Sequence, residues 1–504
     1  MTDLFTWASA CTADAITLYW ENPDSIHKNS FYRIFMNGKT VAETQKTHFT
    51  FDGLTPDTDY DFMMCLVSEA PTEFCAGFTL RTSAVKRPLD VSKAPYLARG
   101  DGRTLNTAVL QKAIDDCGPN ETVYLPAGVF LTGALRLHSD MELYLAAGAV
   151  LQGTVAPADY LPRIPSRFEG TEMLCYSSLL NLGALDHNDG YNCKNVLIHG
   201  KGTLASGGKT LAMAVIASEQ ARMKDEPAQM QAPVNACEKP ETIPGRVRPR
   251  LINISNCQNI RISGLSLENG ASWNVHMIYS DHIVTDHCTF RSEGVWNGDG
   301  WDPDSSTNCT LFASKFFTGD DAVAVKSGKN PEGNVIGRPC KHIRIFDCVS
   351  AFGHGICLGS EMSGGIEDVR IWDCDLLMSE FGIELKATAK RGGYIRDVHV
   401  RNCRLARVLI HSVAYNDDGV GAGALPVFED CRFENLHLGG EYLDGSRQWH
   451  PCDGIVLCGF DKAGHAVQNV TFKNIRMAGR IPGRPQNISL QHCKNICLEN
   501  VYSE

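Results

Sequence analysis

The sequence predicts an all-β protein in which a small antiparallel β-sandwich precedes a long parallel β-helix. Residues 1–85 contain short segments in which apolar and polar positions alternate, as they do in half-buried antiparallel strands. Further along, a polar residue followed by alternating apolar positions recurs at spacings of 23 to 26 residues. With 504 residues, the chain is also longer than one ordinary compact domain.

The N-terminal segment has three clear strand patterns, at residues 15–20, 31–35 and 61–65. Asn37-Gly38 is a typical hairpin turn between short strands. The alternation over these segments indicates antiparallel strands.

Leu54 to Tyr60 resembles the tyrosine-corner segment of fibronectin type III domains, with Trp20 as the core tryptophan. The resemblance implies a fibronectin type III-like β-sandwich over residues 1–85. A linker over 86–94 and a β-helix over 95–504 would follow it. We expect the sandwich to be a structural cap rather than a sugar-binding module.

The repeating part of the chain starts each unit at an asparagine, aspartate or histidine. A period in the twenties suits a parallel β-helix, because stacked coils pair the backbone and bury the inner side chains. Leucine-rich repeats have a similar period, but the recurring leucines and the fixed asparagine that they need are absent. The repeats start at Asn195, Asn259, His282, His342, Asp368, Asp397, Asn469 and Asn495.

Two segments depart from the strand pattern. Residues Thr107 to Cys117 have apolar positions at helical spacing, which predicts a short amphipathic helix. Residues 205–250 interrupt the repeats with a helical run from Leu211 to Met223 and a proline-rich end. We expect this insertion to wall one side of a cleft.

The 20 cysteines follow the repeat rather than a disulfide framework. Cys288, Cys348, Cys374 and Cys403 each lie six residues after the start of a repeat. This recurrence predicts a stacked interior row of free thiols, in preference to disulfides or metal ligands. No cysteine or histidine cluster has the spacing of a zinc site.

Composition and charge exclude several kinds of partner. The chain has 58 acidic and 47 basic residues and no long basic run, which argues against nucleic acid. No segment approaches the roughly 18 apolar residues of a membrane helix, so no membrane partner is expected. The residues after Met1 lack a signal-peptide pattern, which predicts a cytoplasmic protein, or a secreted one if a signal peptide was trimmed. The oligomeric state is not determined by the sequence.

Four polar clusters follow one another on successive repeats. Asp299 lies 21 residues before Asp320, about one coil, and neighbouring coils are about 4.8 Å apart. Glycosidic hydrolysis needs a protonated carboxyl group and an ionised one close together, and like charges raise the pKa of one member. The clusters are Asn297-Gly298-Asp299-Gly300, Gly319-Asp320-Asp321, Gly353-His354-Gly355 and Gly382-Ile383-Glu384-Leu385-Lys386.

Each cluster alone also fits an ordinary β-turn, where aspartate and glycine are common. A calcium site is a second alternative, but neither aspartate loop has the alternating oxygen-ligand spacing of a calcium loop. The succession of carboxylates, histidine and lysine on consecutive coils favours an active site over both alternatives.

The motifs resemble those of glycoside hydrolase family 28, the polygalacturonases and related pectin-degrading enzymes, and most of all their bacterial exo-acting branch. The resemblance covers residues 95–504. It is carried by Gly100-Asp101-Gly102-Arg103-Thr104, Arg248-Pro249-Arg250-Leu251-Ile252, the run from Asn297 to Ser306, the run from Gly359 to Gly365, and Arg391-Gly392-Gly393.

The resemblance implies a right-handed, pectin-lyase-like β-helix and hydrolysis with inversion. It assigns Asp320 as the general acid, and Asp299 and Asp321 to holding and activating water. His354 would tune the acid and bind substrate. Lys386 would bind the sugar beside the scissile bond, and Asn297 stands where the family has its asparagine.

Glu384 departs from the family pattern, in which an arginine stands two residues before the lysine. That arginine helps to hold a galacturonate carboxylate, and a glutamate in its place would repel one. Either Lys386 suffices alone, Arg391 or another arginine reaches in, or a neutral sugar lies on the leaving-group side with Glu384 accepting its hydroxyls.

We therefore expect an inverting hydrolase of α-linked galacturonosyl residues in pectic oligosaccharides that acts from a chain end. No metal or organic cofactor is needed, because carboxylates alone can do the acid–base work. Alternatives are a hydrolase of rhamnogalacturonan or another substituted pectin, a non-catalytic carbohydrate-binding β-helix, and a pectate lyase.

Overall fold

The computed structural model describes residues 7–21, 30–67, 74–188, 190–225, 240–415, 418–478 and 487–503. The chain forms two compact units, Met1–Pro88 and Leu89–Glu504. Residues Arg87–Asp90 form strand β8, which pairs with a strand of the second unit, and Leu89 and Val91 are buried in that unit's core. The segment expected to be a linker, 86–94, is therefore largely part of the second unit.

The first unit consists of two antiparallel sheets with one shared core. One sheet has the strand order β1-β2-β5 and the other β4-β3-β6-β7. Side chains from both sheets, among them Trp20, Ile34, Phe51 and Phe62, are buried together, as the predicted sandwich requires. The strands are β1 (Trp7–Cys11), β2 (Ala15–Trp20), β3 (Phe31–Met36), β4 (Lys39–Thr44), β5 (His48–Asp52), β6 (Asp59–Val67) and β7 (Phe74–Arg81).

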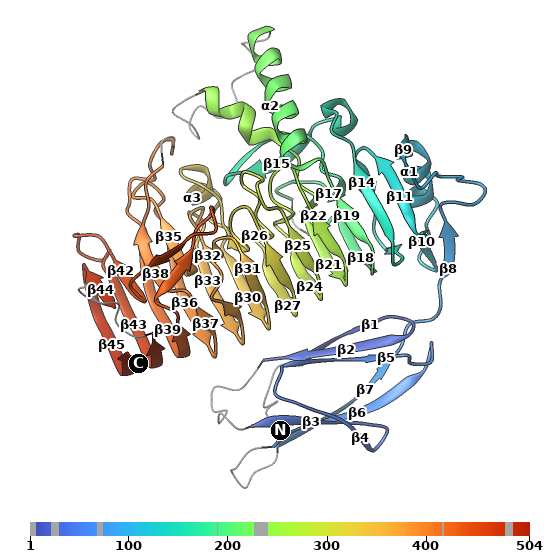
Figure 1. The fold of residues 1–504 in the computed structure, drawn as a ribbon. Coiled ribbons are helices and arrows are strands. Elements are labelled where there is room, and N and C mark those ends of the chain that lie inside the picture. Colours follow the sequence, from blue (N-terminus) through green and yellow to red (C-terminus); the bar gives the residue numbers. More distant parts are fainter. Residues whose placement is uncertain are drawn as a thin grey trace. The chain divides into compact units, whose positions relative to one another are not determined.

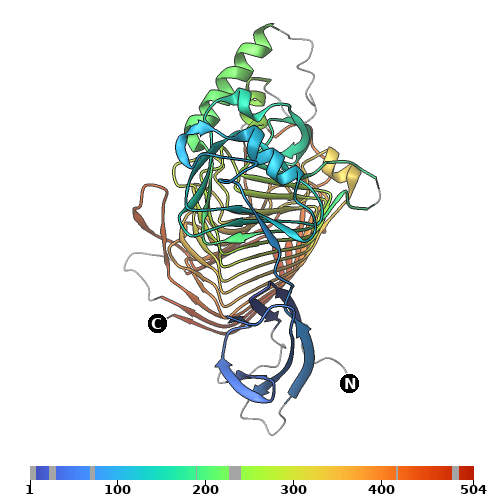
Figure 2. The ribbon, with the colours of Figure 1, turned by 90° about the vertical axis from the view of Figure 1, so that its right-hand side faces the viewer.

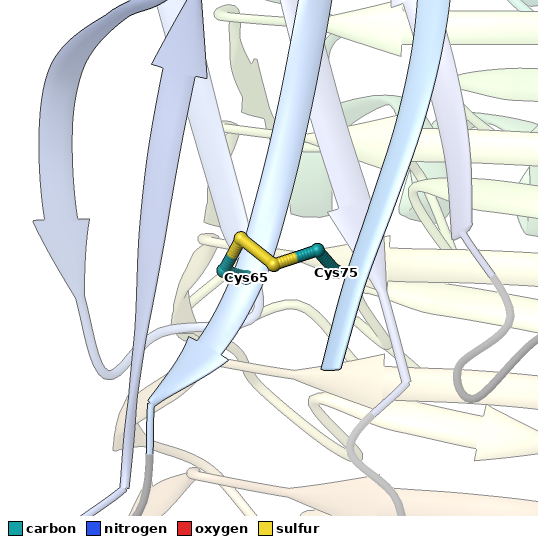
Figure 3. Close-up of a disulfide and its surroundings, with 2 residues drawn as sticks. All are labelled: Cys65 and Cys75. Atoms are coloured by element: carbon teal, nitrogen blue, oxygen red, sulfur yellow. A yellow bond between two sulfur atoms is a disulfide. The ribbon is translucent and has the colours of Figure 1, made fainter. Parts of the chain in front are cut away.

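A disulfide joins Cys65 of β6 to Cys75 of β7, which lie directly opposite each other in the antiparallel pair (Figure 3). The prediction of free thiols was wrong for this pair. Within the segment that resembles a tyrosine corner, the Thr55 backbone N–H donates to the Tyr60 hydroxyl at 2.8 Å.

The second unit is a right-handed parallel β-helix whose coils stack along one axis (Figure 1). Most coils contribute three strands, two to a 23-stranded sheet and one to an 11-stranded sheet, and in the last coils one long strand replaces the first two. Viewed along this axis, successive coils of the β-helix superpose (Figure 2).

The 23-stranded sheet is built from two columns of strands, which the long strands β39, β43 and β45 span. The first column contains β8, β10 (Glu121–Leu125), β13 (Met141–Leu145), β18 (Cys193–Gly200), β21 (Cys257–Ser263), β24 (Asp281–Asp286), β27 (Thr307–Phe312), β30 (Cys340–Phe346), β33 (Ile366–Trp372), β36 (Tyr394–Arg401), β39 (Val427–Leu438), β43 (Val467–Met477) and β45 (Cys493–Ser503). The second contains β9 (Asp101–Leu105), β11 (Gly128–Thr132), β14 (Ala149–Gly153), β19 (Thr203–Ala205), β22 (Ser266–Glu268), β25 (Thr289–Arg291), β28 (Lys315–Phe317), β31 (Val349–Phe352), β34 (Asp375–Leu376) and β37 (Arg404–Leu405).

The 11-stranded sheet positions the candidate site. Its strands are β12 (Leu135–Leu137), β17 (Leu180–Gly183), β20 (Ile252–Ser255), β23 (Val275–Ile278), β26 (Trp301–Asp304), β29 (Val323–Val325), β32 (Gly355–Leu358), β35 (Gly382–Ala387), β38 (Val408–Ser412), β42 (Ile455–Cys458) and β44 (Ile488–Gln491).

The residues that start the sequence repeats bend the first strand of each coil. All eight have a left-handed backbone, with φ between 53° and 58°. Asparagine, aspartate and histidine tolerate this conformation better than apolar residues do. Their amides also stack: Asn259 donates to Asn195 at 3.1 Å, and Asn495 donates to Asn469 at 3.1 Å.

The predicted row of interior thiols is confirmed. Cys288, Cys348, Cys374 and Cys403 are free and buried in the core. Each follows a left-handed residue in the turn between the two columns, so the four occupy equivalent positions. The backbone N–H of Cys374 contacts the Cys403 sulfur at 3.4 Å, as expected for stacked coils.

Helices lie at one end of the solenoid and beside it. Helix α1 (Thr107–Asp115) buries Leu110, Ala113 and Ile114 against the first coils, as its helical spacing predicted. The interrupting segment forms α2 (Gly208–Asp225) and the 3-10 helix η3 (Pro240–Val247), and α2 stands out from the coils (Figure 1). Shorter elements are η1 (Pro157–Tyr160), α3 (Glu332–Ile336), and the hairpins β15–β16 (Ile164–Phe168, Thr171–Cys175) and β40–β41 (Glu441–Leu443, Trp449–Pro451). Within the described ranges, no helix has the length and apolar character needed to cross a membrane.

Candidate active site

The predicted site residues lie where chain segments enter the 11-stranded sheet. Asn297 and Asp299 precede β26, Asp320 and Asp321 precede β29, and His354 precedes β32. Glu384 and Lys386 lie in β35 and Arg391 follows it, and all eight line one cleft of about 880 Å³. Because β26, β29, β32 and β35 are successive parallel neighbours, the structure brings together the residues that the sequence selected.

The interrupting segment forms part of the cleft wall, as expected. Ile216 of α2 and Thr242, Gly245 and Arg246 of η3 line it, together with Glu169 from the β15–β16 hairpin.

His354 connects the two adjacent aspartates. Its Nδ1 lies 2.9 Å from Oδ1 of Asp320 and 3.0 Å from Oδ1 of Asp321. Burial by itself would lower the pKa of His354, but the hydrogen bonds to both carboxylates raise it to about 11, so the imidazole is a cation at neutral pH. The Asp320 side chain is 25% exposed and that of Asp321 only 5%, so Asp320 presents its carboxyl group to the cleft.

Lys386 bridges two carboxylates. Its Nζ lies 3.3 Å from Oδ2 of Asp321 and 3.0 Å from Oε2 of Glu384. Burial opposes ionisation of Asp321, but Lys386 and His354 outweigh it and hold the pKa of Asp321 well below its usual range. Asp321 is therefore an ionised carboxylate.

Glu384 does not present its charge freely to the cleft. The residue is 2% exposed, and His411 of β38 lies 2.7 Å from its other oxygen, Oε1. Burial would raise the pKa of Glu384, but Lys386 and His411 lower it to about 2. Glu384 is therefore not a free charge that faces the substrate, because its carboxylate forms ion pairs inside the wall, and any effect on a substrate carboxylate acts through its contact with Lys386.

Asp299 and Asp302 form a second carboxyl pair next to a buried lysine. Nζ of Lys326 lies 3.2 Å from Oδ2 of Asp299 and 3.5 Å from Oε2 of Glu361. Burial raises the pKa of both Asp299 and Asp302. The nearby Asp299 raises the pKa of Asp302 further, whereas Lys326 opposes the shift of Asp299, to which Asp320 and Asp321 add. These shifts favour the protonated form of the pair, and the contact of Lys326 with Asp299 favours the proton on Asp302.

Asn297 and Trp296 are held by one buried arginine. The Arg248 guanidinium donates to Oδ1 of Asn297 at 2.6 Å and to the Trp296 carbonyl at 2.8 Å. It also stacks on the Trp296 ring, 4.2 Å from the centroid. Trp296 nevertheless remains 59% exposed and lines the cleft, so a fixed indole faces the solvent there.

Comparisons with known proteins identify the family. A model described as glycosyl hydrolases family 28 matches residues 189–418. A probable polygalacturonase of Vitis vinifera is 34% identical over 404 residues, which cover 76% of this chain and 74% of that protein. The chain belongs to glycosyl hydrolase family 28.

Two further similarities extend over nearly the whole chain. An exo-poly-alpha-D-galacturonosidase of Dickeya chrysanthemi is 26% identical over 540 residues, covering 97% of this chain and 89% of the relative. The structure of the family 28 exopolygalacturonase of Yersinia enterocolitica superposes with a TM-score of 0.79 at 21% identity, covering 98% of each chain. The second match supports the fold.

As a family 28 glycoside hydrolase, the protein has the two kinds of carboxyl group that hydrolysis requires. Asp320 is the exposed one and accepts a hydrogen bond from a cationic imidazole. Asp321 is an enclosed carboxylate, and the Asp299–Asp302 pair lies beside them.

Arg391 belongs to the wall rather than to the open cleft of this family 28 protein. It is 2% exposed, and its guanidinium pairs with Asp418 and donates to Oδ1 of Asn330 at 2.6 Å and to the Ser360 carbonyl at 2.9 Å. The expectation that Arg391 reaches toward a sugar carboxylate is therefore not supported by its contacts.

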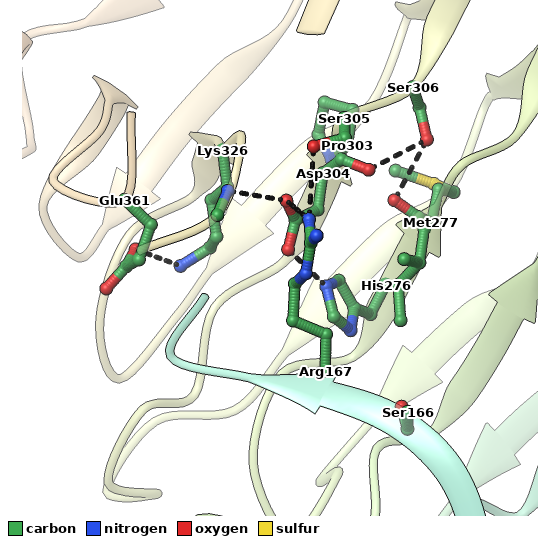
Figure 4. Close-up of polar contacts among 12 residues, drawn as sticks. Ser166, Arg167, His276, Met277, Pro303, Asp304, Ser305, Ser306, Lys326 and Glu361 are labelled. Carbon is green, nitrogen blue, oxygen red and sulfur yellow. Dashed lines mark hydrogen bonds and ion pairs between the residues drawn. The ribbon is translucent and has the colours of Figure 1, made fainter. Parts of the chain in front are cut away.

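Asp304 does not line the cleft but supports the segments around it, and it was not among the residues predicted from the sequence. Arg167 of β15 and His276 of β23 converge on its carboxylate, at 2.7 Å and 3.3 Å (Figure 4). The Gly328 N–H also donates to it at 3.1 Å, so Asp304 ties the β15–β16 hairpin and the loop before Lys329 to β26. The signal was present, because Asp304 lies in the quoted family motif, two residues after Asp302.

Two groups of side chains could in principle supply three metal ligands among the described residues: Asp320, Asp321 and His354, and Asp321, Cys357 and Glu384. In the first group, Nδ1 of His354 already contacts the Asp320 and Asp321 carboxylates at 2.9 Å and 3.0 Å. In the second, Lys386 already lies against both carboxylates. These donors fit a hydrogen-bond network better than a metal centre.

Proposed function

We propose that this glycoside hydrolase removes galacturonosyl residues from the ends of pectic oligosaccharides by a single displacement with inversion. The observation that carries the proposal is the convergence of Asp299, Asp320 and Asp321 on one cleft, with only Asp320 substantially exposed. Exo action is favoured by the similarity to the Dickeya exo-enzyme over 97% of the chain.

In the proposed mechanism, Asp320 protonates the glycosidic oxygen as the bond to the anomeric carbon breaks. Asp321 and Asp299 hold a water molecule on the opposite face of the sugar and accept its proton as it attacks. The cationic His354 holds both members of the Asp320–Asp321 pair and stabilises the negative charge that Asp320 acquires when its proton leaves.

Basic side chains support a uronate substrate. Lys329 and Arg246 line the cleft, and burial together with the nearby Arg246 and Arg391 lowers the pKa of Lys329 to about 8. A substrate carboxylate placed beside these cations would relieve their mutual repulsion and restore the charge of Lys329.

Product analysis tests the proposal. Incubation with trigalacturonate should release galacturonate and digalacturonate first, with new reducing ends and without the ultraviolet absorbance of an unsaturated lyase product. Proton NMR of the first product should show the β-anomer before mutarotation. Internal cleavage of longer chains, an α-anomer or an unsaturated product would each refute one part of the mechanism.

Hydrolysis of rhamnogalacturonan or another substituted pectin is the second candidate, because Glu384 replaces the arginine of the family pattern. A screen of defined pectic oligosaccharides separates the two. A pure binding protein is disfavoured, because three clustered carboxyl groups cost more in repulsion than sugar binding gains.

We also propose that the N-terminal unit is a fibronectin type III-like module with a structural role. The three-plus-four strand arrangement and the Thr55–Tyr60 hydrogen bond support this. Isolated residues 1–88 should fold, because their core is separate from that of the β-helix, and should not bind pectic oligosaccharides.

A further inference from the structure

We propose that the cleft does not recognise the carboxylate of the sugar on the leaving-group side, so that an esterified or otherwise neutral sugar is accepted there at least as readily as galacturonate. The inference rests on the proposed function and deepens it by naming the substrate class. It follows from the ion pairs that Lys386 forms with carboxylates of the protein itself.

Lys386 has little capacity left for an anion. Its ammonium lies 3.0 Å from Glu384 and 3.3 and 3.4 Å from the two oxygens of Asp321. An ammonium group has three donors, and these two carboxylates occupy two of them. The remaining N–H suits a hydroxyl or ring oxygen, whereas a third carboxylate would meet two anions already bound to the same cation.

Glu384 cannot turn away to release Lys386. Its Oε1 is held by Nε2 of His411 at 2.7 Å, and its Oε2 accepts from the Cys357 thiol at 3.4 Å as well as from Lys386. The same sulfur lies 3.0 Å from Oδ1 of Asp321, so its single S–H lies between the two carboxylates that flank Lys386 and can donate fully to only one of them. Strand register fixes the set, because Cys357 lies opposite Glu384 and Lys386 lies opposite His411.

The other cationic side chains near Lys386 also have protein partners. His354 is bonded to Asp320 and Asp321. Arg407 does not line the cleft, since it stacks between Phe381 and Tyr442 and donates to the Glu380 carbonyl at 3.1 Å. Arg391 is buried against Asp418.

The charges around Lys386 therefore disfavour binding of a substrate carboxylate on the leaving-group side. Asp321 and Glu384 contribute two negative charges and Lys386 one positive charge, and all three side chains are at least 89% buried. In such a low-dielectric wall an added anion is repelled more strongly than in water. Glu384 and His411 act here as positioning residues, because they set the contacts of Lys386 and need not touch the substrate.

The two monomethyl esters of digalacturonate provide the direct test with the full-length enzyme. An ester on the reducing-end residue, which leaves, should not lower kcat/KM by more than about threefold relative to the free acid. An ester on the non-reducing residue, which is released, should reduce kcat/KM by at least about tenfold. A tenfold loss with the reducing-end ester would overturn the inference while leaving the proposed function intact. If neither ester nor digalacturonate is hydrolysed, the proposed function fails and the inference with it.

Glu384→Gln tests the physical cause, because the amide keeps the shape and removes one charge. The preference for the free acid over the reducing-end ester should rise about fivefold to tenfold, seen mainly in KM. His411→Asn, which loosens Glu384, should shift the preference in the same direction by less. Glu434→Gln is the matched control, since Glu434 pairs with His399 at 3.1 Å on the 23-stranded sheet, away from the cleft. An unchanged preference in Glu384→Gln would overturn the charge argument, and an equal change in Glu434→Gln would show a general structural effect instead.

Discussion

Nδ1 of His354 lies 2.9 Å from Oδ1 of Asp320, one coil of the solenoid away. This contact orients the exposed carboxyl group that the proposed mechanism uses as the acid. It also couples the charge of the imidazole to the state of the carboxyl group, which makes both residues open to test.

Asp320→Asn should reduce kcat at least about 10³-fold while the protein still folds, with no more loss of stability than the lost charge contact with His354 explains, because an amide cannot donate the proton but fills the same space. Kinetics on trigalacturonate and thermal unfolding check this. Asp375→Asn, which removes an exposed carboxylate paired with Arg404 at 2.8 Å, is the control. Near-normal turnover of Asp320→Asn would refute the acid assignment.

His354→Asn should make stability depend on pH in a defined direction. The pKa of His354 is raised from 6.5 to about 11, so its stabilising effect is full below pH 6.5 and is lost as the pH rises toward 11. The difference in unfolding free energy between wild type and variant should therefore be largest at pH 6 and shrink toward pH 10. Denaturant unfolding at both pH values measures it, and a difference that grows with pH would contradict the assigned contacts.

Glu384→Arg should lower both stability and activity, although it restores the residue type of the family pattern. A guanidinium in the place of Glu384 would lie beside Lys386 and His411 in a buried wall, and breaking such a buried pair typically costs about 3–5 kcal/mol. Thermal unfolding and kcat/KM on digalacturonate check this. A stable variant with improved activity would instead support direct repulsion between Glu384 and the galacturonate carboxylate.

Trp296→Ala should raise KM for trigalacturonate roughly tenfold with little change in kcat, because a sugar ring stacks on an exposed, fixed indole. Trp296→Phe should retain most of the affinity. Trp449→Ala provides the matched control, since Trp449 is 48% exposed and does not line the cleft. Equal KM values in wild type and Trp296→Ala would exclude a stacking role.

Cys75→Ser should destabilise the N-terminal unit by about 2–3 kcal/mol, as expected for a disulfide that closes a short loop. The hydrolytic rate should not change, since the site lies wholly in the β-helix. Unfolding of residues 1–88 with and without reductant measures the effect. The thiol state of Cys65 and Cys75 in cells also tests the predicted cytoplasmic location, because a reducing compartment would keep them reduced.

Much of the architecture could be predicted because it is local. A left-handed residue such as Asn259 or His282 recurs once per coil, and a cysteine such as Cys374 recurs in the next turn. Each coil repeats the same backbone demands, so the period is visible in the sequence. The eight candidate residues were visible for the same reason, since successive coils place equivalent positions side by side.

Contacts that cross coils or join the hairpin to the solenoid were not predictable from the sequence. Such contacts depend on which side chains meet after packing. Examples are the ion pair between Lys326 and Asp299, the hydrogen bond that Arg248 donates to Asn297, and the Cys65–Cys75 disulfide. Glu384 is the clearest case. Its identity was plain in the sequence, but whether its charge faces a substrate or is neutralised depends on His411, one coil further on. The sequence by itself determined the repeat and the residues presented on each coil, because these follow from local backbone preference. Only the tertiary structure decided which charges are exposed and which are paired, because burial and ion pairing depend on neighbours that are distant in the chain.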